Sequence, residues 1–182
     1  MSGGVHFQTV RAPLYTAEQR RRRDATRWTY VQGVLAILQF AVFLISLALV
    51  LHFLLTGSGF LAATISVVAK TIALYAIMVT GSIWEKVVFD RYLFAPAFYW
   101  EDAVSMLVLA LHTAYLIALL FNLLTEREQM LLALAAYATY AVNAAQFILK
   151  FRKARLETPP AREVDTKAQQ SSITALPWGV AQ

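Results

Sequence analysis

The sequence contains no cysteine. This absence excludes disulfides, thiolate nucleophiles and cysteine-held zinc or iron–sulfur centres. Its three histidines, His6, His52 and His112, lie far apart in the chain, so the sequence predicts no protein-held metal site. A glycine-rich phosphate loop and a nucleotide-binding fingerprint are also missing. These absences predict a protein that works without a redox, nucleotide or metal cofactor.

Charged residues are scarce, at 15% of the 182 residues, whereas 59% are apolar. Soluble domains are usually about half apolar. The apolar residues gather in four segments, each as long as the roughly 20 residues that a helix needs to cross the hydrocarbon core. They must be helices because lipid offers the backbone no hydrogen-bond partners. The sequence predicts an all-α membrane protein, a four-transmembrane-helix bundle over 26–156 with spans at about 28–55, 60–84, 101–123 and 129–151.

Lysine and arginine flank these spans. Six lie in the N-terminal part of the chain, mostly in the basic segment 1–25, two in the connector 84–102 and six from Lys150 at the end of the fourth span onward, 14 of the 16 in all. The positive-inside rule therefore predicts that both termini and the connector 84–102 are cytoplasmic. This placement also explains the net charge of +5 without a nucleic-acid partner. The Pro-, Gln- and Ser-containing tail 157–182 is expected to be disordered.

The connector 84–102 contains seven aromatic and six charged residues. An interfacial aromatic belt with solvated charges is one interpretation. The other is the mouth of a site, because flat apolar walls and proton donors occur together. Polar residues deeper in the neighbouring spans favour the second interpretation.

Those deeper polar residues recur at helical spacing. In the third span Glu101, Ser105, Val108, His112 and Tyr115 fall on one face. Comparable stripes occur in the other spans: Thr71, Tyr75, Met78, Ser82 and Glu85; Thr139, Asn143, Gln146 and Lys150, with Tyr140 adjacent; and Gln32, Gln39 and Ser46. Because lipid-facing surfaces are apolar, we expect these stripes to face the bundle interior. Interhelical hydrogen bonding accounts for the uncharged members.

The ionisable residues need a further explanation. A charge near the middle of a membrane costs at least about 2.5 kcal/mol, so Lys70 should face a partner, a cavity or an oligomer contact. His112 lies at a similar depth, either as a hydrogen-bonded structural residue or as a functional one. Glu85, Glu101 and Asp102 are either simple boundary charges or carboxyl groups that keep their protons because they are crowded together, as general acids must.

Four stretches of the chain resemble the 3-vinyl bacteriochlorophyllide hydratase family of bacteriochlorophyll synthesis. They are Pro13 to Trp28, Ile77 to Asp102, Ala110 to Leu116 and Leu132 to Phe147. The most specific pieces are Gly-Ser-Ile-Trp-Glu-Lys-Val-Val-Phe and Ala-Pro-Ala-Phe-Tyr-Trp-Glu-Asp. The resemblance implies addition of water across the 3-vinyl group of a chlorophyllide-type tetrapyrrole, which gives a 3-(1-hydroxyethyl) product. It carries over no catalytic residues.

The chemistry that the resemblance implies can be matched to the residues above. Protonation of the terminal vinyl carbon leaves a cation on the carbon beside the ring, water attacks that carbon, and a base removes a proton. We assign Glu101 as the leading acid, and Glu85 or Asp102 as the base or water-positioning group. His112 is expected to be an axial ligand of the substrate's own magnesium, or an alternative base.

Substrate contacts are expected from the connector and the fourth span. An aromatic wall would stack on the macrocycle, and Lys86 or Arg91 would pair with the substrate's propionate near the cytoplasmic surface. The expected contacts are Trp84, Lys86, Arg91, Phe98, Tyr99, Trp100, Tyr140 and Asn143. The resemblance further implies a multi-pass protein of the cytoplasmic or intracytoplasmic photosynthetic membrane, with other bacteriochlorophyll enzymes or a second copy of the chain as partners.

Two other functions compete with this one. A non-catalytic pigment carrier or assembly subunit would use His112 and the aromatic wall but would not need the acids. A small proton-coupled transporter would use Lys70 and the polar stripes, but four spans without an inverted repeat disfavour it.

Overall fold

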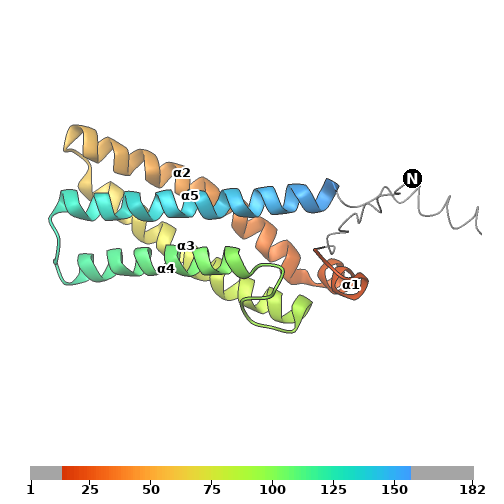
Figure 1. Ribbon diagram of the computed structural model, residues 1–182. Coiled ribbons are helices and arrows are strands. Elements are labelled where there is room, and N and C mark those ends of the chain that lie inside the picture. Colours follow the sequence, from red (N-terminus) through yellow and green to blue (C-terminus); the bar gives the residue numbers. More distant parts are fainter. Residues whose placement is uncertain (1–13, 157–182) are drawn as a thin grey trace, which may run out of the picture. The chain divides into compact units, whose positions relative to one another are not determined.

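The computed structural model describes residues 14–156, which form five helices and no strand (Figure 1). The helices are α1 (Ala17–Ala25), α2 (Arg27–Thr56), α3 (Phe60–Phe89), α4 (Tyr99–Leu120) and α5 (Glu126–Leu156). The last four are long and apolar enough to cross a membrane. The prediction of an all-α membrane protein with four spans is therefore confirmed. The expected disordered tail 157–182 and the first 13 residues of the basic segment lie outside the described residues.

The boundary between the second and third spans differs from the predicted one. Helix α3 continues five residues beyond position 84, to Phe89, so the connector to α4 comprises only residues 90–98. The extra turn is held by the Lys86 ammonium, which donates to Asp90 Oδ1 at 2.8 Å, and by Val88, which is buried. Asp90 then takes a left-handed conformation with φ 62°, which ends the helix. The charged residues of the connector that looked like loop residues are thus partly helical.

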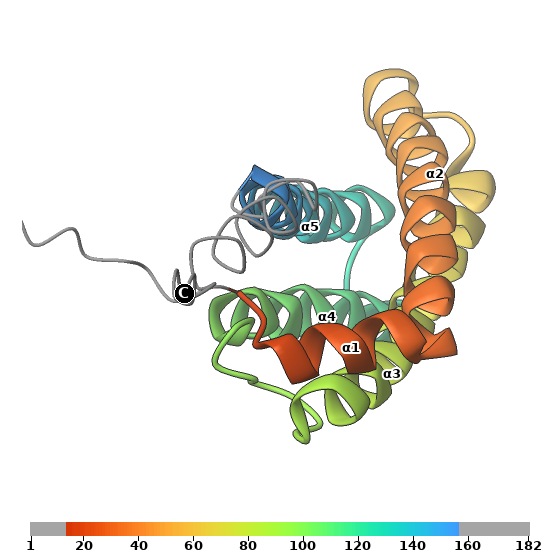
Figure 2. The same ribbon diagram turned by 90° about the vertical axis from the view of Figure 1, so that its right-hand side faces the viewer.

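Local sequence signals account for the other helix ends. Thr16 and Gln19 form a reciprocal capping box at the start of α1. Thr26 caps the start of α2. Gly57 and Gly59 both have positive φ, at 70° and 85°, and make the turn from α2 to α3. In Figure 2, α1 lies beside the end of α3, against which it packs.

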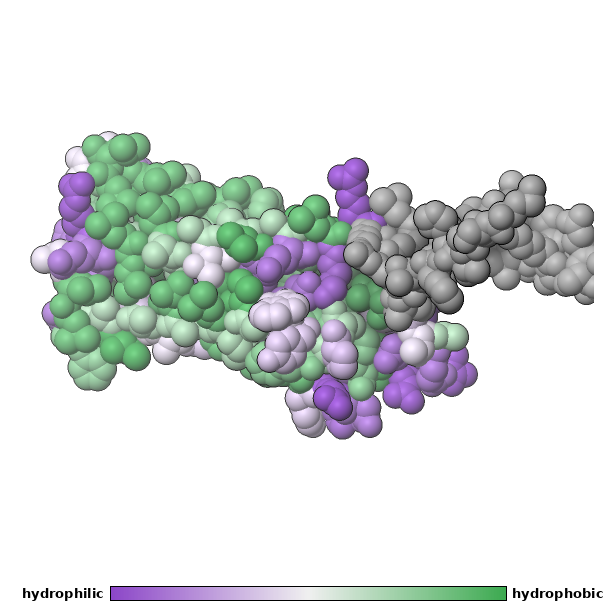
Figure 3. Space-filling view, in the orientation of Figure 1, coloured by the Kyte–Doolittle hydropathy of each residue, from purple (hydrophilic) through white to green (hydrophobic). Residues whose placement is uncertain are grey.

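The polar stripe of α4 faces the interior as predicted, since all five of its members are buried. In the other helices the outcome is mixed: Glu85, Thr71, Gln39, Ser46 and Asn143 are buried, whereas Tyr75, Ser82, Gln32 and Thr139 are partly exposed. The outer surface is apolar, with Ile37 and Leu120 each 75% exposed. Figure 3 shows this hydrophobic surface along the helices, with hydrophilic residues toward its ends.

Polar side chains link the helices within the compact unit Leu14–Phe147. They join α2 to α3, α3 to α4 and α4 to α5: Gln32 Nε2 donates to Thr80 at 2.7 Å, the Tyr75 and Thr113 hydroxyls lie 2.7 Å apart, and Asn143 Nδ2 donates to Ser105 at 2.8 Å. Such bonds contribute about 0.6 kcal/mol each in membranes. They orient the helices and thereby fix which side chains face one another.

Candidate active site

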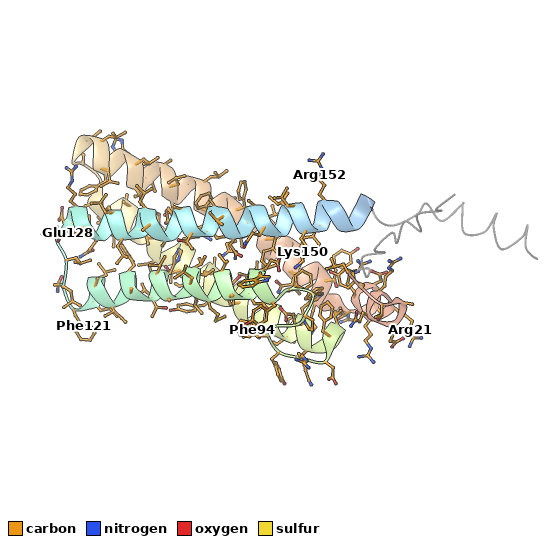
Figure 4. The ribbon with its side chains drawn as sticks, viewed as in Figure 1. Arg21, Phe94, Phe121, Glu128, Lys150 and Arg152 are labelled. Atoms are coloured by element: carbon orange, nitrogen blue, oxygen red, sulfur yellow. The ribbon has the colours of Figure 1, made fainter. Side chains whose placement is uncertain are left out.

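Three carboxylic acids are buried where α3 ends and α4 begins. Glu85, Glu101 and Asp102 are only 6%, 7% and 4% exposed. The Glu85 and Asp102 carboxyl groups lie close enough to interact directly. We call these three residues the acid cluster. In Figure 4 the label of Phe94 marks the connector beside them, and Phe121 and Glu128 mark the opposite end of the helices.

Two of the acids hold the connector in place. The Phe94 N–H donates to Asp102 Oδ2 at 2.7 Å, and the Ala95 N–H donates to Glu85 Oε2 at 3.3 Å. Phe94 has φ 57°, a left-handed conformation that costs energy for a bulky residue and that these bonds stabilise. The third acid, Glu101, is buried in the first turn of α4.

Asp102→Ala is expected to destabilise the protein by about 1–3 kcal/mol, because the Phe94 N–H loses its acceptor. Asp102→Asn keeps an acceptor oxygen and should cost less. Thermal unfolding of the purified protein in detergent measures both. An unchanged unfolding midpoint for Asp102→Ala would show that the connector does not depend on this bond.

The predicted aromatic wall divides into two groups. Trp84 and Phe98 pack in a cluster, with ring centroids 5.8 Å apart, and Phe98 is 1% exposed. Tyr15, which no sequence pattern singled out, stacks on Phe89 at 5.8 Å and joins this cluster. Its only signal was its place in the first stretch of family resemblance.

Tyr99 and Trp100 instead lie on the surface, 50% and 72% exposed, with their rings 5.6 Å apart. Phe94 contacts Tyr99 at 5.6 Å. The structure therefore does not bring the four wall residues together. It offers a buried aromatic cluster on one side of the acids and an exposed aromatic pair at the start of α4.

The two cations expected near the propionate differ in their surroundings. The Lys86 ammonium is paired with Asp90 and, through that hydrogen bond, holds the pKa of the Asp90 carboxyl below its usual range. Arg91 is exposed. Lys86 therefore already has a carboxylate partner within the chain.

A second polar group lies deeper in the helices. Lys70 is fully buried; its Nζ lies 3.5 Å from the centroid of the Tyr140 ring and has no hydrogen-bond partner among residues 14–156. A cation over an aromatic face gains about 2 kcal/mol when desolvated, so Tyr140 offsets much of the cost of the charge. Lys70 also lies close enough to His112 to act on it electrostatically. We call Lys70, His112 and Tyr140 the Lys70 group.

His112 has one ring nitrogen bonded and one open. Its Nδ1 lies 2.8 Å from the Val108 carbonyl oxygen, which can only accept, so Nδ1 carries the hydrogen. In a neutral ring the lone pair is then on Nε2, which is buried and has no partner in the described part of the chain. Asn143, the other deep residue predicted, is likewise buried, and its Oδ1 is unpartnered there.

The acid cluster and the Lys70 group are well separated along α4. His112 follows Glu101 by eleven residues, which is about 16 Å at the rise of an α-helix. A cavity of about 310 Å³ lies farther away, at the opposite end of the helices, lined by Phe53, Leu54, Leu55, Gly57 and Arg127. None of the predicted site residues lines that cavity. Within residues 14–156 no three His, Asp or Glu side chains are grouped to hold a metal ion.

Four long apolar helices with carboxyl groups buried at one end define a multi-pass membrane protein. The model of the family described as 2-vinyl bacteriochlorophyllide hydratase (BCHF) matches residues 15–153, and the chain belongs to this family. The number 2 in that description and the number 3 used above denote the same vinyl position in two numbering conventions of the macrocycle.

Two relatives show the closeness of the match. The 2-vinyl bacteriochlorophyllide hydratase of Cereibacter sphaeroides is 64% identical over 149 residues, covering 82% of this chain and 92% of the relative. The protein with the same description from Rhodobacter capsulatus is 63% identical over 147 residues, covering 81% and 85%. No solved structure matches the chain.

Proposed function

We propose that this chain adds water to the vinyl group of a bacteriochlorophyllide-type tetrapyrrole and forms the 1-hydroxyethyl product. The observation that carries the proposal is the identity of more than 60% to two proteins described by this activity, over most of both chains. The burial of three carboxyl groups at one end of the spans supports it, because the reaction needs a proton donor and a proton acceptor in a place shielded from bulk water.

We assign the proton donor to Glu101. It is buried in the first turn of α4, next to Asp102 in the sequence, and a buried carboxyl group can keep the proton that the reaction needs. Protonation of the terminal vinyl carbon gives a cation at the adjacent carbon, which the macrocycle delocalises. The Glu85 and Asp102 pair stabilises this cation, and one of these carboxylates orients the attacking water and takes its proton. The proton given by Glu101 is thus balanced by the one removed from water.

The distance along α4 limits what His112 does in the same turnover. A bond of about 2 Å to magnesium and carbon–carbon bonds of about 1.5 Å place the end of the vinyl group less than about 8 Å from the metal. With the metal–histidine bond and a contact to the acid, this reach is about 13 Å, whereas the backbone rises about 16 Å along α4 from Glu101 to His112. Both roles in one turnover therefore require the two side chains to extend toward each other, and we favour Glu101 as the acid.

Substrate contacts follow from the two aromatic groups. The exposed Tyr99 and Trp100 rings give the macrocycle a surface on which to stack. The partly buried Trp84 and the buried Phe98 form a second aromatic group, and Asn143 offers a buried oxygen without a partner in the described part of the chain. Arg91 or Lys86 would pair with the propionate if it stays at the membrane surface.

The positively charged residues support cytoplasmic termini. Arg20 to Arg23 and Arg27 precede the first span, and Lys86 and Arg91 lie at the same end of α3, whereas Arg127 is the single basic residue of the described α4–α5 junction. In this proposed orientation the acid cluster would lie at the cytoplasmic side of the inner or intracytoplasmic membrane, where biosynthetic neighbours or a second copy would meet it. The orientation can be tested with a reporter enzyme that is fused to the C-terminus and is active only outside the cytoplasm. A signal from this reporter would contradict cytoplasmic termini.

A single assay tests the proposed function. The purified protein in detergent is incubated with the vinyl tetrapyrrole free acid in water enriched in ¹⁸O, and the pigments are separated by chromatography. We expect a hydroxyethyl product that carries one ¹⁸O atom. Pigment that binds but is recovered unchanged would identify a carrier instead. The same incubation without protein controls for spontaneous hydration.

A further inference from the structure

The Lys70 ammonium has no counter-charge within the described residues. None of the ion pairs there includes it, and the contact that it makes is with the face of the Tyr140 ring. His112, which Lys70 acts on electrostatically, offers no negative charge. A buried cation over an aromatic face, in surroundings of low dielectric, attracts an anion more strongly than a cation at the surface does.

We propose that Lys70 binds the free carboxylate of the tetrapyrrole substrate. This inference rests on the proposed function, which supplies the class of ligand: a chlorophyllide differs from a chlorophyll in carrying its propionate as the free acid. The surface alternatives are weaker partners, because Lys86 is already paired with Asp90 and Arg91 is exposed to solvent. Lys70 is the described lysine whose charge is buried and unmatched.

The dimensions of the ligand agree with this placement. Bond lengths of about 1.4–1.5 Å put the propionate carboxylate as far as about 12 Å from the end of the vinyl group. Adding a contact of about 3 Å at each end gives a reach of about 18 Å, which exceeds the backbone rise of about 16 Å along α4 from Glu101 to His112, the residue that Lys70 acts on electrostatically. A macrocycle whose carboxylate binds Lys70 is thus long enough for its vinyl group to reach the level of the acid cluster, past the hydrogen-bonded Ser105 and Asn143.

This arrangement gives the enzyme a way to distinguish a free acid from an ester. An esterified propionate carries no charge, so it leaves the Lys70 ammonium unpaired and loses the interaction. Removal of one partner of a buried charge pair weakens binding by about 30-fold or more. The wild-type protein should therefore have a KM for the methyl ester of the vinyl tetrapyrrole at least about 30-fold higher than for the free acid.

The experiment compares hydration of the free acid and of its methyl ester by purified wild-type protein, Lys70→Met and Lys70→Gln. We expect both variants to raise the KM for the free acid to the value for the ester, while ester turnover stays as in the wild type. Lys70→Arg should keep the preference for the acid, since it keeps the charge. Arg127→Met, at an exposed position at the opposite end of the helices, is the matched control that should leave the preference intact. Lys86→Met and Arg91→Met test the alternative that the carboxylate binds at the membrane surface.

Several outcomes would overturn the inference. If the wild-type enzyme hydrates the acid and the ester equally well, the inference is wrong but the proposed function stands. This comparison does not depend on the folding of any variant. Loss of the acid preference in Lys86→Met or Arg91→Met would place the carboxylate at the membrane surface. Loss of ester turnover together with acid turnover in both neutral Lys70 variants would assign the lysine a structural role. Failure of the wild type to hydrate either compound would refute the proposed function itself.

Discussion

Glu101→Gln is expected to lower the rate of hydration at least about 100-fold, which is the lower end of what a general acid contributes. Glutamine has nearly the same size as glutamate but cannot give a carboxylic proton to the vinyl carbon. Because the connector amides are held by Glu85 and Asp102, the change should leave the fold and pigment binding intact. The expected result is thus a protein that binds the tetrapyrrole and leaves it unhydrated.

The measurement pairs turnover with pigment binding. Product is quantified by chromatography under single-turnover conditions, and binding is followed through the absorption of the bound pigment. Glu126→Gln, at an exposed position at the start of α5, serves as the matched control and should behave as the wild type. Turnover of Glu101→Gln at the wild-type rate would exclude Glu101 as the acid. His112 would then be the alternative acid–base residue.

Phe98→Ala is expected to cost about 3–5 kcal/mol of stability, the range for removing a buried phenylalanine ring. Phe98 is 1% exposed and precedes α4 directly. Its ring contacts those of Tyr15, Trp84, Phe89 and Phe147, which come from the segment before α1, from α3 and from α5. The substitution should therefore loosen the acid cluster as well as lower the free energy of unfolding.

Unfolding by heat or by increasing denaturing detergent measures this loss. Tyr99→Ala removes a neighbouring aromatic ring that is 50% exposed, and it should change stability by no more than about 0.5 kcal/mol. A loss for Phe98→Ala as small as that for Tyr99→Ala would show that the aromatic cluster does not join these helices.

The sequence predicted more of the fold than of the site. Apolar length and periodicity suffice to locate the four spans and to orient Glu101, Ser105, His112 and Tyr115 inward, because lipid tolerates only apolar outer surfaces. The same periodicity could not reveal that α3 extends to Phe89, since that turn depends on the contact of Lys86 with Asp90. Helix ends are decided by such individual side-chain contacts.

The predicted aromatic wall shows why the site could be predicted less well than the fold. Trp84, Phe98, Tyr99 and Trp100 look equivalent in the connector, yet two are packed in a cluster and two lie on the surface. Consecutive residues of a helix point in directions about 100° apart, so neighbours in sequence need not share a face. Where the connector ends and α4 begins therefore decides which rings face the acids.

By itself the sequence determined that this chain is a four-span membrane protein with a polar interior and, through its resemblance, the family to which it belongs. Only the tertiary structure decided how the ionisable residues divide their roles: Glu85 and Asp102 hold the connector, Lys86 is paired, and Lys70 meets the Tyr140 ring. The physical reason is that hydrophobic burial depends on each helix alone, whereas pairing of charges depends on which helices are neighbours and how each is rotated.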